Sequence, residues 1–298
     1  MTIDMAFAGG PFDHAETQRD TESLQKYVEH KHAMAILISD GSPALLPDGT
    51  LKRVHPKEMI GRDIFAPGPL FLGLDNGKPL FAFNLKVDEG SPASEGEQFE
   101  NMRNVAGRMD PRDLAIAGRA KSLIGWHMSH QFCARCGTQS VSMEGGLKRV
   151  CTNTACAREH FPRVNPVVIM LVVHEDSVLL GRGETWPEGA YSALAGFVSP
   201  GETMEEAVRR EVWEETGVTI ENAKYIMSQP WPFPSQLMMG MICEAKGRDL
   251  TINTKEIETA QWFDRATVEA VFAKESDAFL YPPRFTIAHQ LLRWWLTT

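Results

Sequence analysis

Four cysteines place the tightest constraint on how this chain of 298 residues can fold. Cys133 and Cys136 stand in "FCARCG", and Cys151 and Cys156 in "CTNTAC", which gives C-x2-C, fourteen residues and C-x4-C. Two close pairs on short turns can bring four thiolates into the tetrahedron that structural Zn²⁺ prefers. Because protein ligands would fill all four positions, we expect one structural zinc and no catalytic role for it. Chance pairing, or loss of the metal, is the alternative.

Charge and hydropathy exclude several classes of protein. The formal net charge of −9 argues against broad attraction to nucleic acid. The longest apolar run, "VVIMLVV", has seven residues, whereas a membrane helix needs roughly 20. The first ten residues, "MTIDMAFAGG", lack the basic start and apolar stretch of a secretory signal. We therefore expect a cytoplasmic protein with no membrane span, in which the cysteines stay reduced.

The order of patterns predicts a β-rich region followed by helices and strands. Up to about residue 125, apolar runs such as "AILISDG" and "PLFAFNL" alternate with turn signals, and a Gly-, Ser- and Glu-rich loop begins at Asp88. Helical spacing over 110–130 predicts a helix that leads into the cysteines. The stretch 166–183 predicts two strands joined by a turn at Glu175-Asp176.

The segment 196–218, "GFVSPGETMEEAVRREVWEETGV", concentrates six carboxylates. Thr203 and Glu206 form a capping-box pattern, which predicts a helix from Met204 that ends at Gly217. Glu211, Glu214 and Glu215 then share one face and repel one another. A stripe of Met204, Val208 and Val212 would dock this helix on a sheet. A solvated helix face is the simplest explanation of the charge. A hard divalent cation such as Mg²⁺, bridging to phosphates, would instead offset the repulsion.

The same segment is similar, at every specified position, to the signature of the Nudix hydrolases, G-x5-E-x7-R-E-U-x-E-E-x-G-U, where U is a bulky aliphatic residue. The matching residues are Gly196, Glu202, Arg210, Glu211, Val212, Glu214, Glu215, Gly217 and Val218. The resemblance implies an α+β fold, a Nudix α/β/α sandwich with a mixed sheet, in which Mg²⁺ or Mn²⁺ assists attack of water on a diphosphate. It implies that Glu211 and Glu215 are the main metal ligands, with Glu214 nearby and Arg210 orienting the carboxylates. Glu215 is our choice of base.

A second motif narrows the branch of the family. Residues 228–235, "SQPWPFPS", resemble the motif of the NADH pyrophosphatase branch, although a Pro-rich turn around a core tryptophan would look the same. Together with the cysteines, the motif implies three domains: 1–125, a smaller and mostly β N-terminal domain; 126–162, a zinc ribbon; and 163–298, the catalytic domain. The activity implied is hydrolysis of NADH or NAD⁺ to the mononucleotide and AMP, by a homodimer.

The resemblance also carries over individual positions. Glu244 and the backbone carbonyl of Ala195 would complete the divalent-metal site. Six residues would contact the substrate: Phe197, which stacks on a base; Gln229 and Trp231; Ile169 and Ala288, which line the pocket; and Phe161, which stands where the branch has a tyrosine that reaches the partner subunit's site. We expect Cys243 to be a small core residue and His127, His130 and His160 to have packing or surface roles.

Three departures from the branch pattern affect the choice of substrate. Ser235 precedes Gln236 where serine is expected at 236, Ser199 replaces a frequent glutamate, and Phe161 replaces tyrosine. These departures bear on the ranking of NADH over related dinucleotides. The resemblance also implies an alternative substrate, NAD-capped RNA, because the branch is associated with removal of that cap, although the charge of −9 offers no evident RNA track. A module that senses a dinucleotide without cleaving it is the alternative from another functional class.

Overall fold

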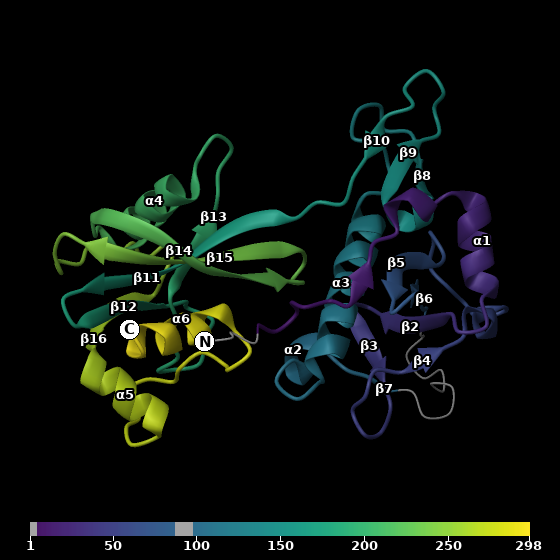
Figure 1. The fold of residues 1–298 in the computed structure, drawn as a ribbon. Helices are drawn as coiled ribbons and strands as arrows, with labels where there is room; N and C mark the ends of the chain where they lie inside the picture. Colours follow the sequence, from purple (N-terminus) through teal and green to yellow (C-terminus); the bar gives the residue numbers. More distant parts are fainter. Residues whose placement is uncertain (1–4, 87–97) are drawn as a thin grey trace. The chain divides into compact units, whose positions relative to one another are not determined.

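The computed structural model describes residues 5–86 and 98–298. The loop predicted from Asp88 lies largely outside these residues. The chain divides into two compact units, each described here by itself (Figure 1). The N-terminal unit comprises residues 6–164 together with 231–235, and the C-terminal unit comprises the remaining described residues.

The C-terminal unit is built on a six-stranded mixed sheet in the order β14-β15-β11-β12-β16, with β13 paired to β11. Its strands are β11 (Asn165–His174), β12 (Ser177–Arg182), β13 (Leu194–Phe197), β14 (Ile220–Trp231), β15 (Gln236–Ala245) and β16 (Thr259–Asp264). The long apolar run forms β11, the central strand, which is parallel to β15 and antiparallel to β12 and β13. The two strands predicted around Glu175-Asp176 are confirmed.

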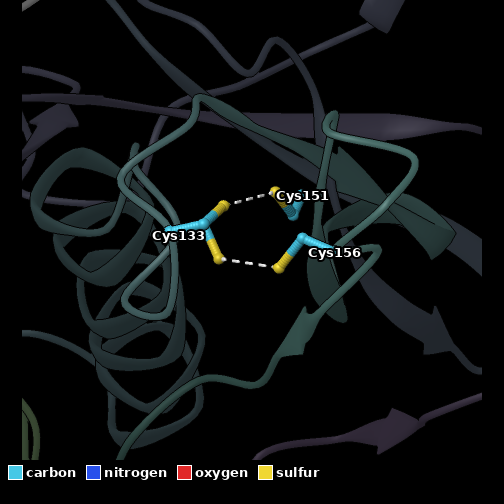
Figure 2. A group of neighbouring side chains, drawn as sticks. Cys133, Cys151 and Cys156 are labelled. Carbon is cyan, nitrogen blue, oxygen red and sulfur yellow. Dashed lines mark hydrogen bonds between the residues drawn. The ribbon is translucent and has the colours of Figure 1, made fainter.

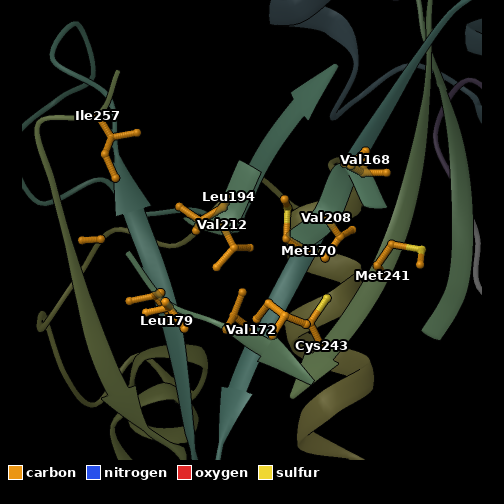
Figure 3. Close-up of a cluster of buried hydrophobic side chains, with 14 residues drawn as sticks. Val168, Met170, Val172, Leu179, Leu194, Val208, Val212, Met241, Cys243 and Ile257 are labelled. Atoms are coloured by element: carbon orange, nitrogen blue, oxygen red, sulfur yellow. The ribbon is translucent and has the colours of Figure 1, made fainter. Parts of the chain in front are cut away.

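A helix covers each face of this sheet. Val168, Met170 and Val172 of β11 pack with Val208 and Val212 of α4 (Met204–Thr216) in one buried core (Figure 3). Since side chains alternate along a strand, the odd-numbered residues of β11 face the opposite side.

The opposite face carries α6 (Ile287–Leu296). There, a Cβ on Gly240 of β15 would come within 3.0 Å of Ile287 and 3.2 Å of Leu291. The predicted α+β fold with an α/β/α sandwich is confirmed. The remaining helix of this unit, α5 (Arg265–Ala273), follows β16.

The N-terminal unit contains a seven-stranded sheet in the order β1-β5-β6-β2-β3-β7, with β4 paired to β2. Its strands are β1 (Phe12–Asp13), β2 (Met34–Ser39), β3 (Ser42–Leu45), β4 (Arg53–Val54), β5 (Leu70–Asp75), β6 (Lys78–Asn84) and β7 (Gln98–Phe99). Its helices are α1 (Thr21–Glu29), α2 (Met102–Val105) and α3 (Pro111–Ser129), with 3-10 turns at Glu16–Gln18 and Pro56–Met59. The predicted mostly β character and the helix before the cysteines are confirmed.

Two local features complete this unit. Asp40 and Gly41 join β2 to β3 with φ values of 45° and 70°, the backbone that a two-residue hairpin turn requires and that Asp-Gly favours. After α3, a three-stranded sheet of β8 (Ser140–Met143), β9 (Lys148–Cys151) and β10 (Glu159–His160) forms, with a 3-10 turn at Glu144–Gly146 between the first two strands. No helix in the described part of the chain is long and apolar enough to cross a membrane.

Candidate active site and zinc site

The carboxylate helix α4 has the predicted caps. Thr203 Oγ1 accepts a hydrogen bond from the Glu206 N–H (3.2 Å), and the Glu206 carboxylate accepts one from the Thr203 N–H (2.8 Å). Gly217 ends the helix at φ 72°, with its N–H donating to the Trp213 carbonyl (2.8 Å). Because Val208 and Val212 are fully buried, the rotation of the helix about its axis is set. This rotation brings Glu211, Glu214 and Glu215 to one side.

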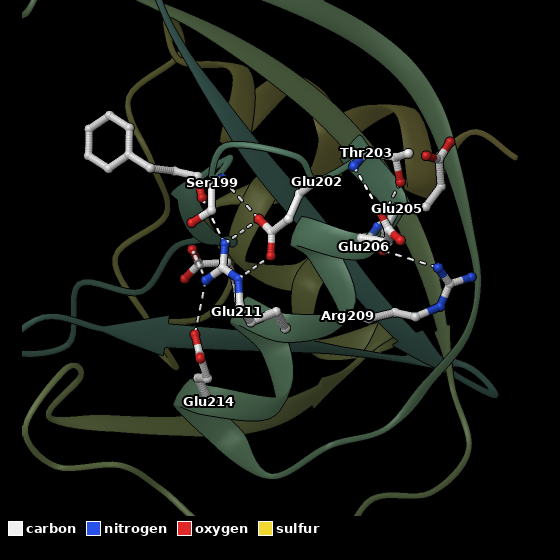
Figure 4. A network of polar contacts seen from close by, with 10 residues as sticks. Ser199, Glu202, Thr203, Glu205, Glu206, Arg209, Glu211 and Glu214 are labelled. Carbon is white, nitrogen blue, oxygen red and sulfur yellow. Dashed lines mark hydrogen bonds and ion pairs between the residues drawn. The ribbon is translucent and has the colours of Figure 1, made fainter.

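Arg210 ties the loop before the helix to the helix carboxylates. Its Nε and Nη2 donate to the two Glu202 oxygens (2.6 and 2.8 Å), and Nη2 also donates to the Phe197 carbonyl (2.9 Å). Its Nη1 donates to Glu211 (2.7 Å) and Glu214 (3.0 Å), within the network drawn in Figure 4. These bonds lower the pKa of Glu202 to about 2. Charge-assisted hydrogen bonds of this kind orient their carboxylates strongly.

Gly196 is required because the Glu211 carboxylate lies against its α-carbon. Gly196 is paired with Val168, whose side chain faces α4, so a Cβ at position 196 would point at the helix. Built there, that Cβ would overlap the carboxyl group of Glu211. The first position of the signature therefore has a steric reason: only glycine lets the carboxylate approach the backbone.

Glu215 has the environment of a metal ligand. The residue is 8% exposed, and its Oε2 has no hydrogen-bond partner among the described residues. Burial, followed by the charges of Glu211, Glu256 and Glu214, raises the pKa of Glu215 to about 8. Burial also raises the pKa of Glu211. A buried carboxylate with a free oxygen among other carboxylates suits a divalent cation, which would remove both penalties.

Glu256 is a member of this cluster that the sequence analysis missed. It lies in the loop between β15 and β16, and its charge acts on both Glu211 and Glu215. The Asn253 N–H donates to the Glu215 carbonyl (2.9 Å), and the Asn253 side chain donates to Glu256 (3.1 Å). A lone glutamate in a loop carries no sequence signal of its own, so only the folded chain shows its place.

The prediction that Glu244 is a ligand of the divalent metal is wrong. Glu244 is level with Val173 of β11, an odd-numbered residue, so its side chain leaves the sheet on the face opposite α4. Its carboxylate accepts a hydrogen bond from the Asn222 side chain (2.8 Å). Ala195 of β13 is paired with Ile169 of β11, and Ile169 is paired with Gly240 of β15. Gly240 lies four residues before Glu244 along β15. At about 3.3 Å per residue, Glu244 is too far along the strand to share an ion with Ala195.

Three predicted substrate contacts belong to the α6 side of the sheet. Phe197, 55% exposed, is paired with Val167, and Ile169 is paired with Ala195, so both side chains leave the sheet opposite α4. Ala288 lies on α6. Ile169 and Ala288 are buried, so Phe197 is the member of this group whose side chain is exposed to solvent.

The remaining predicted contacts have other surroundings. Gln229 is fully buried; its amide donates to the Phe285 carbonyl (2.8 Å) and accepts from the Ile287 N–H (2.8 Å), which holds β14 to the start of α6. Trp231 belongs to the N-terminal unit, where its ring meets Phe7 edge-on at 5.9 Å. Phe161 is 58% exposed.

The departure at position 199 leaves the network intact. Ser199 contributes its backbone N–H, which donates to Glu202 Oε2 (2.9 Å). Any residue except proline supplies that donor, so the loss of a glutamate side chain does not affect this hydrogen bond.

The four cysteines form one cluster, as predicted. The ligand atoms of Cys133, Cys136, Cys151 and Cys156 all lie within 4.8 Å of one another, which no other group of three or more potential metal ligands does among the described residues. Figure 2 shows labelled Cys133, Cys151 and Cys156 with sulfur atoms turned toward a common centre. Four thiolates at this spacing fit tetrahedral Zn²⁺. They form a structural zinc site, fully supplied with protein ligands.

The histidines near the cysteines differ from one another. His127 is buried between the Gly146 carbonyl (2.9 Å from Nε2) and the Arg149 guanidinium (3.1 Å from Nδ1), and burial lowers its pKa to about 4. His130 stacks on Trp126. Both have the expected packing roles. His160 touches the cluster itself, with Nε2 3.3 Å from Cys133 Sγ. Cys243, as predicted, is a buried core residue.

Comparisons with known proteins agree with this geometry. Residues 163–282 match the NUDIX domain, 26–126 the NADH pyrophosphatase-like rudimentary NUDIX domain and 129–161 the NADH pyrophosphatase zinc ribbon domain. The chain belongs to the Nudix hydrolase family. Its zinc ribbon and N-terminal domain place it in the NADH pyrophosphatase branch of that family.

Three relatives illustrate the range of similarity. The NAD-capped RNA hydrolase NudC of Stutzerimonas stutzeri is 35% identical over 83% of this chain and 85% of its own length. The NAD-capped RNA hydrolase NUDT12 of Macaca fascicularis is 42% identical over 63% of this chain, but the match spans only 43% of that protein. The human mitochondrial NAD(P)H pyrophosphatase NUDT13 is 35% identical over 76% of this chain and 67% of its own length.

Proposed function

We propose that this protein is a divalent-metal-dependent diphosphatase that hydrolyses NADH or NAD⁺ to the nicotinamide mononucleotide and AMP. The observation that carries the proposal is the buried, partly unpartnered carboxylate of Glu215 beside Glu211, Glu214 and Glu256. Relatives named NAD(P)H pyrophosphatase and NAD-capped RNA hydrolase support the choice of substrate class.

Glu211, Glu215 and Glu256, with the Ala195 carbonyl, would hold Mg²⁺ or Mn²⁺. When bound, such a cation neutralises diphosphate charge, polarises phosphorus and lowers the pKa of water. Arg210 holds Glu211 and Glu214 in place while Glu202 holds Arg210. Glu215 keeps one carboxylate oxygen free of other partners, and this oxygen accepts the proton of the attacking water.

Two flat surfaces and a cationic centre are what a dinucleotide diphosphate requires. Phe197 stacks on one base, and Ile169 and Ala288 form the apolar wall behind it. Gln229 acts by holding β14 against the start of α6. Phe161 reaches the substrate site of the partner subunit in a homodimer.

A panel of four substrates tests the activity: NADH, NAD⁺, ADP-ribose and NAD-capped RNA, each with Mn²⁺. We expect AMP release from NADH and NAD⁺. Failure of NADH to release AMP would contradict the proposal. Binding of NADH without cleavage would instead show a sensing module.

A matched pair of variants tests the metal site. We expect Glu256→Gln to raise the Mn²⁺ concentration needed for half-maximal rate by about 10- to 100-fold, because it removes a ligand. Glu244→Gln, on the opposite face, should leave it unchanged. If Glu244→Gln raised the Mn²⁺ requirement and Glu256→Gln did not, Glu244 and not Glu256 would be the metal ligand. Glu215→Gln should lower the rate of NADH hydrolysis at least about 100-fold without unfolding the protein.

NAD-capped RNA is the second candidate substrate, because two of the relatives are named as hydrolases of that cap. The net charge of −9 offers no broad electrostatic attraction for the RNA body. Competition decides between the two: if NADH suppresses decapping at concentrations near its own KM, one site serves both, and the ratio of kcat/KM values ranks them.

The organisation of the protein completes the proposal. Residues 1–125, 126–162 and 163–298 act as an N-terminal domain, a structural zinc ribbon and the catalytic domain of a cytoplasmic homodimer. Sedimentation equilibrium at micromolar concentration should report twice the mass of 33.2 kDa. A single-chain mass would contradict the shared role of Phe161.

A further inference from the structure

The N-terminal unit contains a cavity remote in sequence from the carboxylate cluster. Its volume is about 550 Å³, within the range of about 300–1,000 Å³ typical of small-ligand sites. Its lining comes from four places: the β2–β3 turn, the loop before β5 that carries Phe65, the end of β6 with the residues that follow it, and the C-terminal half of α3. The residues that matter to the argument are Asp40, Phe65, Asn84, Lys86, Lys121 and Met128.

Asn84 is the first sign that this cavity is built for a ligand. Asn84 is only 7% exposed and lines the cavity, and its amide atoms are not among the fully buried, unpartnered side-chain atoms of the described residues. The backbone carbonyl of the same residue accepts a hydrogen bond from the Phe65 N–H (2.9 Å). An amide that borders the cavity can offer both a donor and an acceptor to a ligand inside it.

The charge of the cavity is positive. Lys121 reaches from α3 to the β2–β3 turn, where a Cβ on Gly41 would overlap its Nζ. No ion pair to Lys121 forms among the described residues, although the Asp40 carboxylate acts on it from the turn and the Arg103 guanidinium adds a second positive charge. Lys86 pairs with Asp63 (3.3 Å) and lies 5.2 Å from the centre of the Phe65 ring. Among the residues that line the cavity, Lys86 and Lys121 are cations and Asp40 is the carboxylate.

The walls supply flat and apolar surface beside these charges. Phe65 offers a ring, and Ile124 and Met128 on α3 offer aliphatic surface. A small ligand that uses every one of these groups has a phosphate for the ammonium groups, a flat ring for the apolar wall and a polar ring edge for the amide.

We propose that this cavity is a second ligand site, separate from the carboxylate cluster, which binds a mononucleotide. The phosphate contacts Lys121 and Lys86, the base lies against Phe65 and Met128, and Asn84 hydrogen-bonds the edge of the base. This site does not depend on the proposed hydrolysis, because its residues belong to the other unit of the chain.

Calorimetric titration of the full-length, zinc-loaded protein with AMP tests the site, without added Mg²⁺ or Mn²⁺. The variant is Lys121→Met, and the matched control is Lys78→Met, which removes one exposed lysine from the same unit outside the cavity. We expect Lys121→Met to lose one equivalent of AMP binding or to weaken it at least tenfold. Lys78→Met should bind as the unchanged protein does. Equal binding by the Lys121→Met variant would overturn the proposal.

Further arms separate folding and chemistry from binding. Lys86→Met, at the partly exposed edge of the cavity, should weaken AMP binding in the same direction if Lys121→Met proves unstable. Adenosine, which lacks the phosphate, should bind at least tenfold more weakly than AMP, and inorganic phosphate alone should bind more weakly than AMP. Equal affinity for adenosine and AMP would overturn the phosphate contact. The rate of NADH hydrolysis by the Lys121→Met variant is measured in a separate assay. Loss of AMP binding and loss of hydrolysis can therefore be distinguished.

Discussion

At the scale of the residue, Glu215 shows how a carboxylate can be prepared for a cation. Its Oε2 lies in the interior without a hydrogen-bond partner among the described residues, and Glu211, Glu256 and Glu214 oppose its ionisation. The buried valines of α4 and the hydrogen bonds of Arg210 hold the helix in place, and they offset the unfavourable burial of this carboxylate beside other carboxylates. The Arg210 guanidinium donates hydrogen bonds to the carboxylates of Glu202, Glu211 and Glu214, but it makes none to Glu215.

The raised pKa of Glu215 predicts how stability without a divalent ion depends on pH. The folded protein holds a proton on Glu215 between pH values of about 4.5 and 8, where the unfolded chain has released it. This contribution to stability is complete below the unfolded pKa and is lost as the pH rises through the folded pKa. Without Mg²⁺ or Mn²⁺, we expect the Tm of the unchanged protein to fall relative to the Tm of the Glu215→Gln variant as the pH rises through this range. Differential scanning calorimetry measures both Tm values. A constant difference in Tm between the two proteins would contradict the buried, protonated carboxylate.

At the scale of the element, the close contact between β13 and α4 depends on a missing side chain. We expect Gly196→Ala to displace the Glu211 carboxylate, because the new Cβ would overlap it. A misplacement of about 1 Å in a catalytic group can cost roughly 100-fold in rate. The measurement is kcat for NADH hydrolysis at saturating Mn²⁺. Gly247→Ala, where a Cβ would meet nothing within 4 Å, is the control. Equal rates for the two variants would show that Glu211 can move without consequence.

The zinc ribbon is the element whose short strands depend most on a metal. β10 has only two residues, and little apolar surface can be buried by three strands of this length. We expect Cys151→Ser to reduce the zinc content from one ion per chain toward none and to make 130–162 sensitive to trypsin. Cys243→Ala should keep its zinc, because Cys243 lies in the core of the other unit. Native mass spectrometry and peptide mapping read both effects; loss of zinc from Cys243→Ala would implicate a different ligand set.

At the scale of the whole molecule, each unit has its own hydrophobic core. Leu179 is fully buried in the core under α4, and Leu37 is fully buried in the core of the N-terminal sheet. We expect Leu179→Ala and Leu37→Ala each to cost about 2–5 kcal/mol. In a calorimetric scan, the first should shift a Mn²⁺-sensitive transition and the second a Mn²⁺-insensitive one. A single transition that both substitutions shift equally would show that the two units unfold as one.

The sequence by itself determined the features that depend on local spacing. The caps of α4, the turn at Glu175-Asp176, the cysteine pairs and the shared face of Glu211, Glu214 and Glu215 all follow from residues close together along the chain. Backbone geometry and hydrogen bonding act over these short distances, so the pattern is legible without the fold.

Only the tertiary structure decided which distant residues meet. Glu244 and Glu256 are both glutamates beyond the motif, and the choice between them depends on which side of the sheet each one reaches. Strand register places the Glu244 side chain on the face opposite α4. Glu256 is placed by its loop, where Asn253 donates hydrogen bonds to the Glu215 carbonyl and to the Glu256 carboxylate. The amide of Gln229, which bonds the Phe285 carbonyl and the Ile287 N–H, likewise depends on packing between segments far apart in the sequence. No local pattern records such contacts.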